Sequence, residues 1–175
     1  MLYKKNLIYR KYKKNVFRRV VASPNPVDII EFPIILSLLK EKIIPITCGG
    51  GGIPVIRKGK ELKGVEAVID KDFTSSLLVK KLINKKYKVD LIILTNVDSV
   101  YLNFGKKDKE YSIPKLSLKS AKEYIREGHF QKGSMLPKIK AAIFALENNV
   151  NKVLITSPEY FKDTIKGIAG TRMYK

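Results

Sequence analysis

Apolar residues along the chain fall into two patterns that alternate with each other. Continuous apolar or β-branched runs predict strands, and apolar residues that recur every three or four positions predict helices. The expected strands cover residues 16–22, 43–47, 89–95, 153–156 and 170–174. The expected helices cover residues 28–42, 71–85, 117–126, 138–148 and 158–166, with a hairpin or an excursion over residues 55–64 and loops over residues 96–115 and 128–137. Because strand alternates with helix, the pattern predicts an α/β fold with a mostly parallel open sheet.

Four consecutive glycines follow the expected strand over residues 43–47. They are Gly49, Gly50, Gly51 and Gly52. Glycine reaches positive φ values and lets the backbone approach a bound group closely, and exposed N–H groups in such a turn can form a nest for an anion. Ligands of open α/β sheets also collect at the carboxyl ends of strands. A tight turn without a ligand is the alternative, because the pattern is neither G-x-G-x-x-G nor a P-loop.

The composition indicates a single globular domain. The chain has 175 residues, 45% of them hydrophobic, and a mean hydropathy of −0.12. No apolar run approaches the ~20 residues of a membrane span, so we expect no membrane contact. The one cysteine, Cys48, excludes an internal disulfide framework and favours a reducing compartment, and we expect a cytoplasmic protein.

The net charge of +19 suggests nucleic acid as a partner, since lysine and arginine gain from counterion release on phosphate. The excess is mostly lysine spread over every segment, and no aromatic-studded basic motif accompanies it. We therefore expect no specific nucleic-acid binding. Residues 1–19 hold eight basic residues and no acidic one. We interpret residues 1–16 as a poorly ordered basic extension, followed by one domain over residues 17–175.

Three places in the chain carry candidate chemistry. Residues 70–72 put a lysine between two carboxylates where a strand gives way to a helix, as a phosphoryl-transfer site needs. Taken alone, they are better explained by an N-cap at Asp70 with acidic residues that favour the helix dipole. Residues 95–101 follow a buried strand with short polar side chains that can bind ribose or phosphate oxygens, or form a plain turn. Lys138 follows Pro137 at an expected helix start, where a cation opposes the helix dipole unless an anion binds beside it.

Other chemistries find no support in the sequence. His129 is the single histidine, and without a partner in sequence we interpret it as a solvated loop residue rather than a general base. No cluster of histidine and cysteine has metal-ligand spacing, and no G-x-S-x-G nucleophile turn is present. We therefore expect no protein-bound metal site.

Six motifs together resemble carbamate kinase, of the amino acid kinase superfamily. They are RRVVASP at residues 18–24, CGGGGIPV at 48–55, GVEAVIDKD at 64–72, LTNVDSVY at 94–101, GSMLPK at 133–138 and AGT at 169–171. Their order and spacing agree with that family from about Phe17 to the end of the sequence. The resemblance implies a three-layer α/β/α sandwich, usually in a homodimer.

The resemblance also implies an activity and its residues. The implied reaction is reversible phosphoryl transfer between ATP and carbamate, run towards ATP when arginine is fermented, with Mg²⁺ arriving on the nucleotide. Lys71 and Lys138 would neutralise the transferred group, and Asp72 would orient both lysines. The nucleotide site would comprise Thr95, Asn96, Asp98, Tyr101, Met135 and Lys138. Gly49 to Gly52 would line the phosphoryl and carbamate side.

The chain departs from that family in three respects. The family has a further N-terminal half with a glycine-rich phosphate loop and another catalytic lysine, which nothing in residues 1–16 resembles. Asn96 stands where the family normally has aspartate, and Leu136 where it has glycine. We therefore expect a truncated carbamate kinase, active alone or with a complementing N-terminal half. A non-catalytic nucleotide-binding remnant and a basic nucleic-acid-binding domain are the alternatives.

Overall fold

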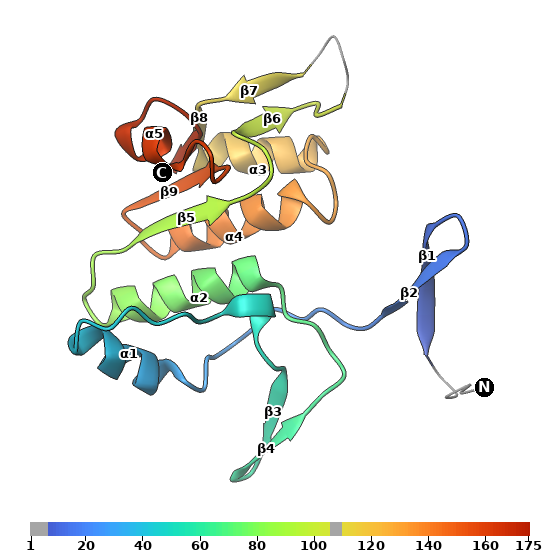
Figure 1. Cartoon of the computed structure of the whole chain (residues 1–175), viewed down its shortest axis with the longest axis vertical. Helices are drawn as coiled ribbons and strands as arrows, with labels where there is room; N and C mark the ends of the chain where they lie inside the picture. Colours follow the sequence, from blue (N-terminus) through green and yellow to red (C-terminus); the bar gives the residue numbers. More distant parts are fainter. Residues whose placement is uncertain (1–6, 106–109) are drawn as a thin grey trace.

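A computed structural model describes residues 7–105 and 110–175 (Figure 1). Its largest sheet consists of β5 (Asp90–Leu94), β9 (Lys152–Thr156), β10 (Thr171–Tyr174) and β8 (Lys115–Ser117), in that spatial order. β5 runs parallel to β9 and β8 runs parallel to β10, while β10 is antiparallel to β9. The sheet is thus mixed and mostly parallel, and the α/β class predicted from the alternating pattern is confirmed.

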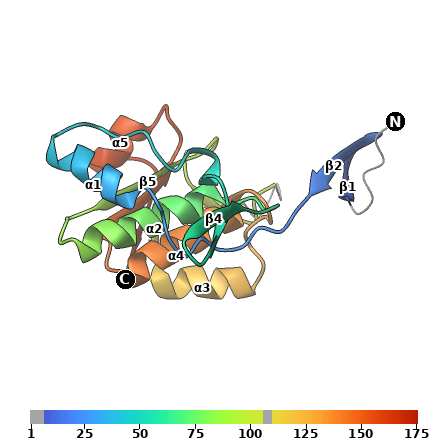
Figure 2. The ribbon, with the colours of Figure 1, turned by 90° about the horizontal axis from the view of Figure 1, so that it is seen from below.

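Helices cover both faces of this sheet. α3 (Leu118–Arg126) and α4 (Met135–Glu147) lie on one face, α5 (Phe161–Lys166) lies on the other, and α2 (Lys71–Asn84) lies beside α4 (Figure 2). α1 (Phe32–Lys40) packs against α2 and begins later than expected, with Pro33 in its first turn. None of the described helices is long and apolar enough to cross a membrane.

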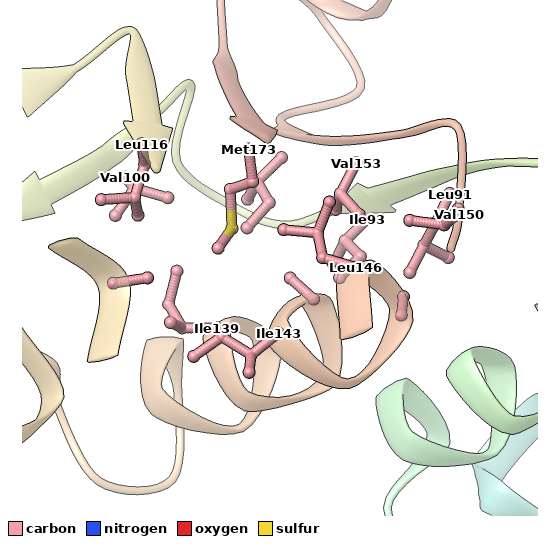
Figure 3. Packing of buried hydrophobic residues seen from close by; sticks show 14 of the residues in the cluster. Leu91, Ile93, Val100, Leu116, Ile139, Ile143, Leu146, Val150, Val153 and Met173 are labelled. Carbon is pink, nitrogen blue, oxygen red and sulfur yellow. The ribbon is translucent and has the colours of Figure 1, made fainter. Parts of the chain in front are cut away.

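The core lies between the sheet and α4. Ile139, Ile143 and Leu146 of α4 point toward the sheet, where Met173 and Val153 are fully buried (Figure 3). These side chains come from positions 139, 143 and 146 because residues three and four apart share one face of a helix. The helical repeat seen in the sequence therefore marks the face of α4 that anchors the sheet.

Small residues let α2 and α4 approach each other closely. Ala141 and Ala145 of α4 are fully buried, and so is Ser76 of α2. Ser76 Oγ lies 2.9 Å from the carbonyl oxygen of Ala141, which ties the two helices directly. As a result, the N-termini of α2 and α4 lie near each other at one end of the sheet.

Two antiparallel hairpins are attached to this core. β3 (Val55–Lys58) and β4 (Glu61–Gly64) form the hairpin expected over residues 55–64. β6 (Val100–Leu102) and β7 (Tyr111–Ile113) form a second hairpin within residues 96–115, which we expected to be a loop. Three-residue strands are too short to give a periodic signal, and this expectation was wrong.

A third hairpin projects from the body of the molecule in both views (Figures 1 and 2). It consists of β1 (Ile8–Lys13) and β2 (Val16–Val20), and its side chains are almost all exposed. The expected extension over residues 1–16 thus contains a strand within its described part, and residues 1–6 lie outside the described residues. Beyond β2, Ala22 forms an isolated parallel bridge with Ala67, so the expected strand over residues 16–22 ends early.

The strand expected over residues 43–47 does not form. These residues have no strand pairing among the described residues, Ile44 is 89% exposed, and Ile46 is fully exposed. β5 is paired on one side, by β9, and lies at the edge of the described sheet. An apolar run becomes a strand only where a neighbouring strand accepts its hydrogen bonds, and residues 43–47 pair with none of the described strands.

Candidate functional site

A cavity of about 450 Å³ opens where the N-termini of α2 and α4 meet the carboxyl end of β5. Its lining comes from the start of both helices, the connection from β5 to β6, β6 itself, and the loop between α3 and α4. Most of the residues singled out from the sequence lie here, namely Lys71, Asp72, Thr95, Asn96, Tyr101, Met135 and Lys138. Segments far apart in the chain therefore converge at the carboxyl end of the strands, where ligands of α/β proteins usually bind.

The charged part of the cavity is built on an ion pair between α2 and α4. Lys138 Nζ lies 2.8 Å from Asp72 Oδ2, and the two side chains are only 12% and 10% exposed. Asp70 caps α2 by accepting a hydrogen bond of 2.8 Å from the backbone N–H of Asp72. The capping interpretation of Asp70 is thus confirmed, and Asp72 lies in the cavity paired with Lys138.

Lys138 lies deeper in its helix than we expected. α4 begins at Met135, so Pro137 falls in the first turn and Lys138 follows it. Proline is tolerated there because the first N–H groups of a helix have no intrahelical acceptor. The positive end of the α4 dipole repels the ammonium group of Lys138, and the carboxylate of Asp72 compensates that repulsion.

Lys71 completes the charged part without a protein partner. Its side chain is exposed, and it forms no hydrogen bond or ion pair with another described residue. It lines the same cavity as Lys138. Two ammonium groups and two helix N-termini therefore face one space, together with two carboxylates that are already engaged, Asp70 as the cap of α2 and Asp72 in the ion pair with Lys138. The unpaired ammonium group of Lys71 and the helix N-termini make this part of the cavity favourable for an anion.

The connection from β5 to β6 carries the polar residues expected at a nucleotide. The N–H of Thr95 donates to Thr156 O at 2.8 Å, and Thr95 Oγ1 donates to Asn96 Oδ1 at 3.3 Å. Tyr101 Oη donates to Asp98 Oδ1 at 2.8 Å, and this hydrogen bond to a carboxylate raises the pKa of Tyr101 to about 12. Asp98 does not itself line the cavity, so it contacts that space through Tyr101.

The quartet Gly49 to Gly52 lies outside the cavity lining. Gly51 has a φ of +89°, and a Cβ built on it would lie 1.8 Å from Ile69 O. Its carbonyl accepts a hydrogen bond of 2.9 Å from Thr74 Oγ1. The turn η1 (Gly49–Gly51) thus packs tightly on the start of α2, and at Gly51 glycine is required by close backbone contact. Cys48 before it is half-buried, and burial raises the pKa of its thiol.

The motif at residues 169–171 has a structural role. Thr171 Oγ1 accepts from the N–H of Val100 at 2.8 Å and donates to Ile113 O at 2.6 Å. Thr171 is fully buried, so both bonds lie inside the protein. They fix the β6–β7 hairpin on β10, and with it the cavity residue Tyr101.

Several residues that line the cavity were not predicted from the sequence. Phe104 follows β6, and His129, Phe130 and Gln131 lie in the loop between α3 and α4. His129 was interpreted as a solvated loop residue, but its ring contacts Asn103, Glu127 and Tyr124. The one signal in the sequence was the position of this loop just before the GSMLPK motif.

Metal binding by side chains alone finds no support in the described part of the chain. No group of three or more histidine, cysteine, aspartate or glutamate side chains there could hold an ion. Asp72 is paired with Lys138, and Asp98 accepts from Tyr101. The donor set fits a Mg²⁺ ion held mainly by the phosphates of a nucleotide, which is how such ions usually bind at phosphoryl-transfer sites.

Comparison with known proteins identifies the family. Residues 6–157 match the model of the amino acid kinase family. The carbamate kinase of Thermoplasma acidophilum is 42% identical over 169 residues, which are 96% of this chain and 53% of that protein. The carbamate kinase of Oenococcus oeni is 44% identical over 91% of this chain and 49% of its own length.

Solved structures agree with the sequence matches. Carbamate kinase from Giardia lamblia bound to AMP-PNP superposes with a TM-score of 0.87 at 37% identity, covering 97% of this chain and 52% of that one. The chain spans about half the length of the curated relatives it matches. The resemblance drawn from the six motifs is confirmed. On the family match and the shared fold, the chain belongs to the amino acid kinase family.

Proposed function

We propose that this chain carries the nucleotide site and part of the phosphoryl-transfer site of a carbamate kinase. The reaction is the reversible transfer of a phosphoryl group from carbamoyl phosphate to ADP, giving ATP and carbamate, as in arginine fermentation. The observation that carries the proposal is the Asp72–Lys138 ion pair at 2.8 Å, in one cavity with Lys71. The carbamate kinases that match the chain support the choice of reaction.

The charged residues would act by position and electrostatics. A phosphoryl group in transit spreads negative charge over its oxygens, and fixed cations stabilise that charge without a covalent intermediate. Lys71 and Lys138 would supply those cations. Asp72 holds the ammonium group of Lys138 in one direction through the 2.8 Å contact. Its low exposure strengthens the pairing, because screening by water is weaker there.

The nucleotide would occupy the rest of the cavity. Thr95 and Asn96 follow β5, Tyr101 and Met135 line the same space, and Asp98 orients the Tyr101 hydroxyl. The Giardia lamblia relative is a complex with AMP-PNP, an analogue of ATP, which supports a nucleotide here. Mg²⁺ would enter on the nucleotide phosphates and neutralise part of their charge.

The single cysteine favours a cytoplasmic location.

A second function is favoured by the glycine quartet. Gly49 to Gly52 would bind the carbamate side, yet they lie outside the cavity lining, and residues 43–47 before them are unpaired. An incomplete acceptor side would leave a protein that binds nucleotide without turnover. In that case the partner of the free β5 edge, either a second copy or the remaining half of the fold, would restore the acceptor side.

Two measurements on the whole chain distinguish the kinase from the protein that only binds nucleotide. ADP with Mg²⁺ should raise the melting temperature, because a ligand that binds only the folded state stabilises it. ATP formation from carbamoyl phosphate and ADP is then measured for the chain alone and with the N-terminal half of the Thermoplasma acidophilum enzyme added. Turnover in either mixture supports a kinase, and binding without turnover in both supports the second function.

Variants link the result to the cavity. Lys138→Met should abolish turnover and weaken ADP binding. Lys122→Met is the matched control, because Lys122 forms an exposed ion pair with Glu147 away from the cavity. If the parent chain shows no ADP-induced shift, or if Lys138→Met behaves like Lys122→Met, the proposed site is wrong.

A further inference from the structure

His129 links the two loops that carry the aromatic part of the cavity. Its Nδ1 lies 3.2 Å from Oδ1 of Asn103, directly after β6, and its Nε2 lies 2.9 Å from Oε2 of Glu127. The ring also meets the Tyr124 ring edge-on, with centroids 5.4 Å apart. The side chain is 22% exposed, so these contacts hold it partly inside the protein.

The two loops contribute the aromatic lining. Tyr101 and Phe104 come from β6 and the turn after it, and their rings meet edge-on with centroids 6.0 Å apart. Phe130 and Gln131 come from the loop between α3 and α4, and Phe130 is anchored in the core. The spacing between these two loops sets the width of the aromatic part, and His129, which lies in the second loop, contacts Asn103 in the first.

The charged part of the cavity is built on other elements. Lys71 and Asp72 begin α2, and Lys138 lies in α4. The Asp72–Lys138 ion pair and the Ser76–Ala141 contact hold those helices together without His129. A change at position 129 can therefore alter the aromatic part while the charged part keeps its geometry.

We propose that His129 is a positioning residue for the base of the nucleotide. By tying Asn103 to the loop between α3 and α4, it holds the edge-on pair of Tyr101 and Phe104 at a fixed distance from that loop. The space between the ring pair and the loop accepts a planar base, which gains from aromatic contact. This inference rests on the proposed nucleotide site and assigns its parts. His129 positions the side chains that contact the base, and the lysines contact the phosphates.

The test compares a ligand that has a base with one that has none. Dissociation constants of the whole chain are measured by calorimetry for ADP with Mg²⁺ and for inorganic tripolyphosphate with Mg²⁺. His129→Ala should weaken ADP binding about tenfold, or about 1.4 kcal/mol. Tripolyphosphate binding should change less than about twofold, well under that energy. His129→Asn keeps a polar group near the position of Nδ1 and should recover most of the ADP affinity.

Two further variants keep the outcome clear. Phe104 is exposed enough that Phe104→Ala leaves the core intact, and it should show the same selective loss of ADP. Lys122→Ala, which removes the ion pair between α3 and the last residue of α4 outside the cavity lining, should change neither affinity.

Three results would overturn the inference. Unchanged ADP affinity in both His129→Ala and Phe104→Ala would refute it while leaving the nucleotide site standing. Equal losses for ADP and tripolyphosphate would show a merely structural role. A parent chain that binds no ADP would refute the proposed function as well.

Discussion

Lys138 shows how a side chain can be held where simple electrostatics disfavours it. Its ammonium group lies in the N-terminal part of α4, where the helix dipole repels a cation. The carboxylate of Asp72 on the neighbouring helix compensates that repulsion at 2.8 Å, and both side chains are mostly shielded from water. The pair therefore couples the stability of the α2–α4 packing to the electrostatics of the cavity.

Asp72→Asn is expected to destabilise the protein. Removing one partner of a mostly buried ion pair leaves an uncompensated charge, which costs about 3 kcal/mol in comparable cases. The free energy of unfolding is measured by urea denaturation. Lys122→Ala breaks the half-exposed Lys122–Glu147 pair and should cost less than about 1 kcal/mol. Equal stability of Asp72→Asn and the parent would show that the pair contributes nothing.

Tyr101 should ionise later than an ordinary tyrosine. Its folded-state pKa is raised to about 12 by the hydrogen bond to Asp98 and by burial. A raised pKa means that the stabilisation is fully present below the pKa of the unfolded chain, near 10, and is lost as pH rises through about 12. Absorbance titration at alkaline pH should show a late phenolate that is missing in Tyr101→Phe. The stability difference between the two proteins should stay constant below pH ~10 and shrink above it.

Residues near in sequence were easier to predict than contacts across the fold. Asp70, Lys71 and Asp72 stand together in the chain, so their position at a helix start could be inferred from capping chemistry alone. The pairing of Asp72 with Lys138 came through the resemblance, and the contact of His129 with Asn103 was not foreseen. No local pattern encodes such contacts, because they depend on how separate elements pack.

At the scale of elements, strands and helices with a long periodic pattern were predicted well. α2, β5, α3 and β9 fall within a residue or two of the expected ranges. The strand over residues 43–47 was predicted on the same apolar signal and is absent. A strand depends on its neighbour as well as on its own residues, and the neighbour is not encoded locally. The β6–β7 hairpin was missed because its strands carry no local signal. It is fixed by hydrogen bonds from Thr171, in a distant part of the chain.

The glycine turn gives a prediction with a matched control. Gly51→Ala would put a Cβ 1.8 Å from the carbonyl oxygen of Ile69 at a φ of +89°. Backbone has to move, so the substitution should cost about 2–3 kcal/mol. Gly49→Ala meets no atom within 4 Å and has no positive φ, so its stability should differ from the parent by less than about 0.5 kcal/mol. Thermal unfolding measures both, and equal melting temperatures would show that η1 does not pack as described.

At the scale of the whole molecule, the family fold is present but one edge of its sheet is open. Among the described strands β5 is paired only with β9, and Leu94 at its end is exposed. Ile44 and Ile46, in the unpaired stretch over residues 43–47, also expose apolar surface. An unpaired strand edge with apolar surface invites association with another chain.

We expect the chain to self-associate when it is produced alone. Sedimentation velocity at tens of micromolar, about the range where exposed apolar surface drives association, should show oligomers. The double variant Ile44→Lys and Ile46→Lys should sediment closer to a monomer, because both side chains are almost fully exposed and their loss should cost less than about 0.5 kcal/mol of stability.

Thr47→Lys is the control for added charge. Thr47 is exposed and lies next to Ile46, so the variant adds a lysine at the same place while both isoleucines stay. It should associate as the parent does. A parent chain that stays monomeric and unfolds in one cooperative transition would contradict the expectation.

The position of β10 in the sheet has a consequence for synthesis on the ribosome. Residues 171–174 lie between β8 and β9, although they follow both in the chain. A nascent polypeptide that has emerged only as far as Gly170 can form α2 and pair β5 with β9, but it has nothing to join β8 to them. The buried Met173 and Thr171 arrive after everything they hold together. Assembly of this domain during translation is therefore delayed until these four residues leave the exit tunnel, and until then its apolar interior is open to chaperones.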